Sequence, residues 1–357
     1  MSSNYADGLS PYENKGILGL PESFDSDDTV SKKCDELANY IKNSKHVVFH
    51  TGAGISTSAG IPDFRGPKGV WTLEKKGEVP KLNTSFDKAT PTKTHMALRA
   101  LVEAGYVQYI VSQNIDGLHL RSGLNRRYIS ELHGNIFIEQ CHTCGRQFVR
   151  STSVESVGQK SLGIRCRLTA SDVGRACRSG SLHDNVLDWE HDLPPKDLDM
   201  AIMHSTMADL NITLGTTLQI VPSGNLPLKN RKGGGKLVIC NLQPTKHVRH
   251  LQILLLTQFN MNTFILQDSK ANLVISSYVD AILSKVCKCL GVEISEYTES
   301  SDPTTHSSLV EWTIPLNHVN TIKSQFRAHL KETVGCSPKR KKARGAVNAP
   351  ASSKINN

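Results

Sequence analysis

The sequence lacks the features of a secretory leader and of a membrane span. Residues 1–7 form neither a basic nor an apolar stretch, so we expect no signal peptide. An uncharged run covers residues 251–267, but its Gln, Asn and Thr content argues against a membrane span. These absences exclude secreted and membrane classes, and they predict that the nine cysteines are thiols or metal ligands rather than disulfides.

Negative charge is also in short supply. The chain has 42 Lys and Arg against 33 Asp and Glu, which gives a formal net charge of +9 and a pI near 9.0. This balance suits acidic partners such as nucleic acid, although a scattered, solvated excess explains it as well. A length of 357 residues fits one large domain, or one domain with a small insert and tails.

A glycine-rich stretch, GAGISTSAGIPDFR, covers residues 52–65 and follows the strand-like run Val47–His50. Gly52 and Gly54 permit a sharp turn close to a ligand, and the hydroxyls of residues 56–58 predict the cap of an anion-attracting helix. The third glycine of a dinucleotide fingerprint is missing, because Thr57 stands in its place. The stretch alone therefore fits either a dinucleotide-binding turn or a plain strand-to-helix turn.

Two further motifs place polar groups after strand-like sequence. They are VSQNIDGLH at Val111–His119 and ELHGN at Glu131–Asn135. With GAGIS…GIPDFR, and with LGTTL at 214–218 and VICNLQP at 238–244, this order resembles the sirtuins, the NAD-dependent protein-lysine deacylases. The resemblance extends to about residue 295. The opening segment, LDWE at 187–190 and PSGNLPL at 222–228 are similar to the class IV, chromatin-associated members.

The pattern of strands and helices predicts an α/β fold with a Rossmann-like parallel sheet, helices on both faces and a small inserted zinc module. We expect helices over Val30–Ile41, Pro91–Glu103 (with Thr94 a possible cap) and Val279–Leu290, and strands at Val107–Ser112, Leu210–Leu214 and Lys236–Cys240. The expected units are a lead-in (1–28), a catalytic domain (29–134 and 182–295), a zinc module (135–181) and a polar, basic tail (296–357).

Four cysteines in hydrophilic sequence predict a structural zinc site. Cys141 and Cys144 have the spacing of a zinc knuckle, and Cys166 and Cys177 follow at irregular intervals. His142 offers an alternative ligand, but the class IV resemblance implies the four thiolates. We expect core thiols at Cys34, Cys240, Cys287 and Cys289.

The resemblance also implies the reaction. The carbonyl oxygen of an acyl-lysine attacks the nicotinamide ribose of NAD, nicotinamide leaves, and O-acyl-ADP-ribose forms with the free lysine. His133 would be the general base, and Asn114 and Asp116 would bind the ribose and the carboxamide. We expect deacylation of histone tails and other chromatin proteins in the nucleus. Mono-ADP-ribosyl transfer, or a catalytically weak NAD or ADP-ribose sensor on chromatin, remains an alternative.

The other expected contacts are with NAD. Arg65 would form charge-assisted bonds and Phe64 would keep water from the reacting carbon. Trp71 is either an NAD contact or an ordinary partly buried aromatic, and Val279 aligns only if the insert is skipped. The expected NAD-binding residues are Ala53, Thr57, Phe64, Arg65, Trp71, Gln113, His133, Gly215, Thr216, Asn241, Gln243 and Val279.

Two segments fall outside the motifs. Residues 251–270 have no counterpart in the family, and they are either a genuine β-hairpin or a translated intron from the gene model. Pro338–Arg344, PKRKKAR, holds five cations and is interpreted as a nuclear localisation signal that also contacts DNA; a solvated charge run is the alternative.

Overall fold

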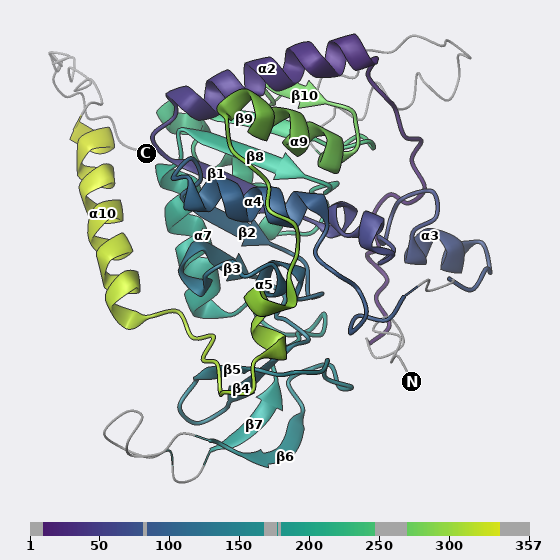
Figure 1. Ribbon diagram of the computed structural model, residues 1–357, viewed down its shortest axis with the longest axis vertical. Coiled ribbons are helices and arrows are strands. Elements are labelled where there is room, and N and C mark those ends of the chain that lie inside the picture. Colours follow the sequence, from purple (N-terminus) through teal and green to yellow (C-terminus); the bar gives the residue numbers. More distant parts are fainter. Residues whose placement is uncertain (1–9, 81–83, 168–176, 178–179, 247–269, 336–357) are drawn as a thin grey trace, which may run out of the picture.

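A six-stranded parallel sheet forms the larger part of the protein (Figure 1). The computed structural model describes residues 10–80, 84–167, 177, 180–246 and 270–335. The strands are β1 (Val47–Thr51), β2 (Tyr109–Ser112), β3 (Ile129–Glu131), β8 (Leu210–Leu214), β9 (Lys236–Cys240) and β10 (Leu273–Ile275). Their order, β10-β9-β8-β1-β2-β3, reverses direction between β1 and β8. The predicted doubly wound α/β fold is therefore confirmed.

Helices cover both faces of this sheet. On one face α2 (Asp27–Asn43), α4 (Lys93–Glu103) and α9 (Val279–Leu290) pack together, and on the other lie α7 (Pro195–Met207) and α10 (Leu316–Gly335). Successive residues of β1 face opposite layers, since Val47 and Phe49 belong to the first core and Val48 to the second. A strand buried on both faces is mostly apolar, and the run Val47–Phe49 therefore predicts a parallel strand although His50 and Thr51 are also buried.

A four-stranded antiparallel sheet forms the small module, at the lower end in Figure 1. Its strands are β4 (Ile138–Cys141), β5 (Gln147–Val149), β6 (Ser161–Arg165) and β7 (Ser181–Asp184), in the order β5-β4-β7-β6. Strand β7 ends at Asp184, three residues after residue 181, where the zinc module was expected to end.

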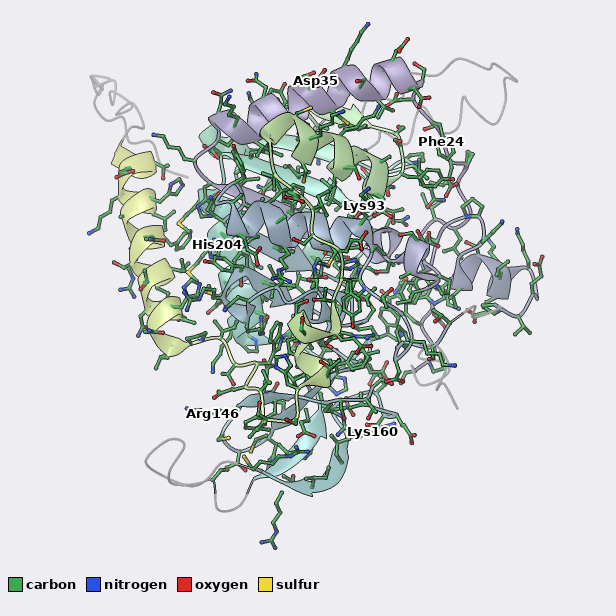
Figure 2. The ribbon with its side chains drawn as sticks, viewed as in Figure 1. Phe24, Asp35, Lys93, Arg146, Lys160 and His204 are labelled. Carbon is green, nitrogen blue, oxygen red and sulfur yellow. The ribbon has the colours of Figure 1, made fainter. Side chains whose placement is uncertain are left out.

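Of the expected tail (296–357), the structure describes residues 296–335, and this part is largely folded rather than a polar tail. It contains the 20-residue helix α10, which packs on α7, and a buried Trp312. Arg121 forms a buried ion pair with Asp302, with Nε to Oδ2 at 2.9 Å. Figure 2 shows Arg146 of the small module, which forms an ion pair with Glu311 at 2.7 Å. The scattered apolar residues of this segment concealed a helix that is stabilised by tertiary packing.

Two local expectations were wrong. No regular helix follows Gly54; the chain forms the short 3₁₀ turns η1 (Ala53–Ile55) and η2 (Thr57–Ala59). The hydroxyl of Ser56 donates to Asp116 at 2.6 Å instead of capping a helix. Thr92, not Thr94, is the N-cap of α4, where it forms a reciprocal pair of bonds with His95.

Three expectations fall mainly or wholly outside the described residues: the insertion, of which Lys270 alone is described, the basic run Pro338–Arg344, and the first nine residues of the lead-in. Among the helices that are described, none has the length and apolar character needed to cross a membrane.

Buried neutral histidines should make the fold sensitive to acid. Burial lowers the pKa of His50 to about 4 and that of His119 to about 3. An unfolded histidine titrates near 6.5, so stability is complete above that pH and is lost as the pH falls toward the folded pKa. Between pH 7.5 and 5.5 we expect each to cost about 1.4 kcal/mol of unfolding free energy.

Urea denaturation at the two pH values measures this loss. The variant His119→Gln should show a smaller decrease between them than the wild type. An equal decrease would contradict the assignment of one of the titrating groups to His119.

Candidate active site and metal centre

A cleft of about 1390 Å³ opens where the strand order reverses, at the carboxyl ends of β1 and β8. Parallel α/β sheets bind ligands at this point, because the connections on its two sides diverge. The structure brings every expected catalytic and NAD-binding residue to the lining of this one cleft. The lining includes Ala53, Thr57, Phe64, Arg65, Trp71, Gln113, Asn114, Asp116, His133, Gly215, Thr216, Asn241, Gln243 and Val279.

The floor of the cleft is the contact between two loops. The Gly54 amide donates to the Gly215 carbonyl at 2.9 Å. A Cβ on Gly54 would lie 2.8 Å from the Cα of Gly215, and a Cβ on Gly52 would lie 2.7 Å from the Cβ of Thr216. Gly52 and Gly54 are therefore required because a side chain at either position would collide with the opposite loop.

His133 is held in one orientation. It follows β3, and its Nδ1 lies 2.8 Å from the backbone carbonyl oxygen of Gln113. A carbonyl accepts only, so Nδ1 carries the hydrogen and Nε2 keeps its lone pair. Burial lowers the pKa of His133, although the bond to Gln113 opposes this shift. The imidazole is thus neutral at pH 7 and able to accept a proton.

Asn114 and Asp116 share a partner that the sequence did not reveal. Ser56 donates from its hydroxyl to Asp116 Oδ2 at 2.6 Å, and the Leu118 amide donates to Oδ1 at 2.9 Å. The Asn114 amide nitrogen donates to the Gly52 carbonyl at 3.1 Å and lies 3.4 Å from the Ser56 hydroxyl. Burial raises the pKa of Asp116, an effect that the Ser56 and Leu118 bonds counteract. Ser56 therefore links the glycine loop to the loop after β2.

Arg65 provides positive charge inside the cleft. Its Nε donates to the Lys15 carbonyl at 2.8 Å, and its guanidinium lies 4.6 Å from the ring centre of Trp71. Its Nη2 is buried without a hydrogen-bond partner. Burial lowers the pKa of Arg65 to about 10, so the group remains charged at pH 7. A buried, unpaired donor on a cation suits an anionic ligand.

The far side of the cleft is formed by the loop after β9 and the start of α9. The Gln243 amide donates to the Leu20 carbonyl at 2.6 Å, and Asn241 donates to the Gln243 carbonyl at 2.7 Å. Beside Val279, Asp280 accepts from Ser58 at 2.7 Å and from the Thr94 amide at 2.8 Å. These bonds fix the η2 loop against α4 and α9.

On the aromatic side of the cleft, sequence reasoning named Phe64 and Trp71 but missed Tyr12 and Trp189. Tyr12 stacks on Trp189 with ring centres 4.4 Å apart, and Trp71 lies 5.4 Å from Trp189 and 4.8 Å from Phe64. Trp71 is buried in the helix α3 (Val70–Lys75), so it is a packed aromatic that also lines the cleft. A signal was present, because the opening segment and LDWE both carry the class IV resemblance.

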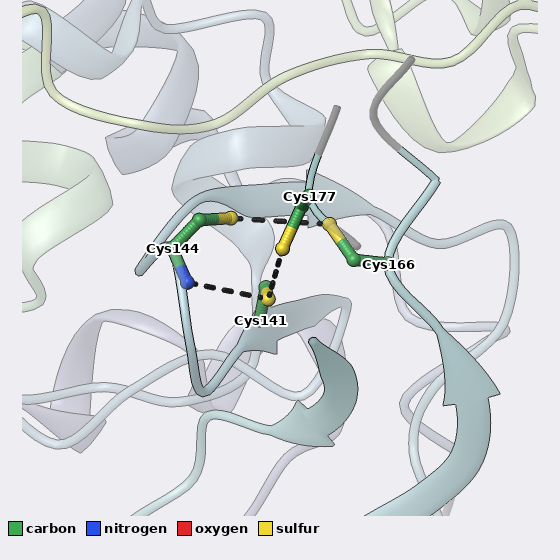
Figure 3. Close-up of side chains that lie close together, drawn as sticks. All are labelled: Cys141, Cys144, Cys166 and Cys177. Atoms are coloured by element: carbon green, nitrogen blue, oxygen red, sulfur yellow. Dashed lines mark hydrogen bonds between the residues drawn. The ribbon is translucent and has the colours of Figure 1, made fainter. Parts of the chain in front are cut away.

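The four expected cysteines converge in the small module (Figure 3). Their Sγ atoms all lie within 4.8 Å of one another, and the pairs Cys141–Cys177 and Cys144–Cys166 are 3.8 Å apart. A tetrahedron with Zn–S bonds of about 2.3 Å has edges of about 3.8 Å, so the arrangement fits a structural zinc ion. His142 stays outside the cluster, with its Nδ1 3.1 Å from the Ser181 hydroxyl.

A glycine with no signal in the sequence completes this metal centre. A Cβ on Gly180 would overlap Cys141 Sγ and lie 2.8 Å from Cys177 Sγ. Among the expected core thiols, Cys34, Cys240 and Cys287 are buried, but Cys289 is exposed and donates to Asp35 at 3.2 Å. That expectation for Cys289 was wrong, because it lies near the end of α9 on the solvent side.

These features define a doubly wound α/β protein with an anion-compatible crevice, a half-buried histidine oriented within it and a cluster of four cysteines with metal-binding geometry. The Sir2 family model matches residues 52–90 and 81–222. The chain is 67% identical over 330 residues to the NAD-dependent protein deacetylase Sirt6 of Drosophila melanogaster, covering 92% of this chain and 98% of that protein. It is 35% identical over 292 residues to human NAD-dependent protein deacetylase sirtuin-7, covering 79% of this chain and 66% of that protein.

Among solved structures, a Sir2 complex with a p53 peptide and NAD⁺ is 28% identical, with a TM-score of 0.50 over 72% of this chain and 98% of that one. A Sir2 bound to acetylated peptide gives the same identity, TM-score and coverage. The chain belongs to the sirtuin family, and its similarity to Sirt6 and sirtuin-7 places it with the class IV sirtuins.

Both Cys144→Ser and Gly180→Ala should weaken zinc retention. The first leaves three thiolates, and the second pushes a methyl group into the cluster. Since structural zinc supplies about 10–16 kcal/mol in small zinc units, loss of the ion should lower the melting temperature of the module. Gly233→Ala is a matched control, because a Cβ there meets nothing within 4 Å.

Zinc content by plasma mass spectrometry and thermal unfolding measure both effects. Full zinc occupancy in Gly180→Ala, with the melting temperature of the control, would contradict the tight fit of the cluster.

Proposed function

We propose that this protein is an NAD-dependent protein-lysine deacetylase. The observation that carries the proposal is the orientation of His133, whose Nε2 keeps a lone pair in a cleft lined by Asn114 and Asp116. The match to Sirt6 over 92% of the chain supports it. When bound, NAD would supply the electrophilic ribose carbon and nicotinamide as the leaving group.

The chain's own residues would then do three things. His133 accepts a proton at Nε2, because Nδ1 is occupied with the Gln113 carbonyl. Arg65 attracts the anionic dinucleotide to the crevice, with the unpaired Nη2 as the available donor. Phe64, packed against Trp71, covers part of the cleft and excludes water from the reacting centre.

The proposed substrates are acyl-lysines of histone tails and other chromatin proteins. Support comes from the formal charge of +9 and from the five cations of Pro338–Arg344, a run outside the described residues. Attack on the same ribose carbon by a different nucleophile would need most of the same residues. Each assay should therefore quantify ADP-ribosylated protein alongside deacetylated peptide and O-acetyl-ADP-ribose.

Replacing His133 with Tyr should lower deacetylation by at least about 10²–10⁴-fold, the usual contribution of a positioned base. The fold, the zinc content and much of the NAD affinity should remain. His306→Tyr is a matched control, because His306 is exposed and lines no part of the cleft. Mass spectrometry of an acetylated histone peptide with NAD gives the rate.

In the wild type the rate should fall on the acid side of its pH profile only below pH 6.5, because burial lowers the pKa of His133 and the neutral imidazole is the active form.

Near-normal turnover in His133→Tyr would contradict the mechanism.

Deleting residues 338–344 should move a tagged protein from the nucleus to the cytoplasm and weaken DNA binding. Peptide turnover should stay unchanged, because the run is remote in sequence from the cleft residues. For every DNA phosphate that the variant no longer neutralises, the log–log salt slope of DNA binding should decrease by about 0.9. Substituting the five cations with Gln keeps the length and serves as the companion variant. An unchanged slope and unchanged nuclear signal would mean that the run is a solvated tail.

A further inference from the structure

The turn that carries His133 is closed by its own ends. Glu131 and Asn135 lie on either side of the histidine, and the Asn135 amide nitrogen donates to Glu131 Oε1 at 2.7 Å. Both side chains are buried, with 5% and 0% of their surface exposed. This bond holds the two ends of the turn, Glu131 and Asn135, together. The turn in turn holds the His133 imidazole at hydrogen-bond distance from the Gln113 carbonyl.

The second oxygen of Glu131 is bound from a distant part of the chain. Trp312, which is 4% exposed, donates from its indole Nε1 to Glu131 Oε2 at 2.8 Å. Its backbone is fixed as well, because its amide donates to the Gln147 carbonyl at 2.8 Å and its carbonyl accepts from Arg126 Nε at 3.0 Å. The backbone of Trp312 is thus anchored at a place from which the buried indole reaches the carboxylate.

Electrostatics make the Glu131 carboxylate dependent on these donors. Burial raises the pKa of Glu131, the charge of Arg126 and the bonds from Trp312 and Asn135 lower it, and the nearby carboxylate of Asp197 raises it. A buried carboxylate oxygen that loses its donor is costly, so the group either protonates or turns toward its remaining partners. Either response disturbs the bond to Asn135.

We propose that Trp312 is a positioning residue for catalysis: its indole N–H holds the Glu131 carboxylate, and this carboxylate holds the turn that places His133. The inference rests on the proposed role of His133 as the base. It gives the segment after α9 and η7 (Pro303–Thr305) a role in the reaction although Trp312 does not line the cleft.

The principal variant is Trp312→Phe, which keeps an aromatic ring and removes the N–H. We expect kcat to fall between about tenfold and a hundredfold, as when a catalytic group is displaced by up to about 1 Å. KM for NAD should change little, because the NAD-binding residues other than His133 keep their positions. Ile314→Ala is the matched control: Ile314 is equally buried in the same segment but belongs to the core beside α7. It should lower the melting temperature without lowering kcat.

The pH profile separates positioning from stability. Without the indole donor the pKa of Glu131 rises further, so protonation of Glu131 and loss of activity should occur at higher pH than in the wild type. Glu131→Gln keeps the volume and cannot titrate, so adding Trp312→Phe to it should cause no further fall in kcat and no shift of the profile. If Trp312→Phe does not fold, the single variant Glu131→Gln takes its place as the principal variant. Glu131→Gln alone should reduce kcat by a similar factor.

The imidazole resonances of His133, assigned by comparison with His133→Tyr, provide a readout that needs no activity. Their titration should change in Trp312→Phe and stay as in the wild type in Ile314→Ala. An unchanged titration, kcat and pH profile in Trp312→Phe would overturn the inference. If the wild type shows no NAD-dependent deacetylation, the proposed function fails, while the resonances still decide whether Trp312 positions His133.

Discussion

The close approach of the loops after β1 and β8 is the constraint around which the site is built. Gly54 and Gly215 touch through their backbones, and no side chain fits between them. Because these two strands are neighbours at the point where the strand order reverses, their connections leave in opposite directions and open the cleft. The remaining site residues are arranged around this contact, on the segment from β1 to α3, on the loops that follow β2, β3 and β9, and at the start of α9.

Buried charge fastens the small module and the C-terminal segment to this framework. Arg126 forms an ion pair with Asp197 at 2.8 Å and donates to the Trp312 carbonyl, while Arg121 binds Asp302. Breaking a buried pair by removing one partner leaves an uncompensated charge, which makes such pairs sensitive to substitution. The apolar cluster around the four cysteines of the small module is small, so a metal ion held by these cysteines would contribute much of the stability of the module. Apolar packing joins the two sheets, because Ile138 and Val149 of the small module belong to the same core as Val47 and Phe49 of β1.

Hydroxyl groups account for the errors made from the sequence near the glycine loop. Ser56 and Ser58 have the residue type of helix caps, but their partners are Asp116 and Asp280, which lie far along the chain. A cap and a tertiary hydrogen bond use the same oxygen, and only the folded chain decides between them. Cys289 is a similar case, because it lies in a helix rich in apolar residues and only the folded chain shows that its side chain faces solvent.

Residue identity and spacing predicted four of the six parallel strands, β1, β2, β8 and β9, and the metal-type pair Cys141 and Cys144. The resemblance to the sirtuins supplied the full set of four cysteines and the residues that line the cleft. A buried strand must be apolar on both faces, thiolate spacing is local, and the motif order is carried by the residues themselves. What those residues touch became apparent only in the folded chain. The Ser56–Asp116 bond, the space at Gly180, the helix α10 and the indole of Trp312 on Glu131 join residues with no local signal for each other. Packing and burial, which depend on the whole chain, select these contacts.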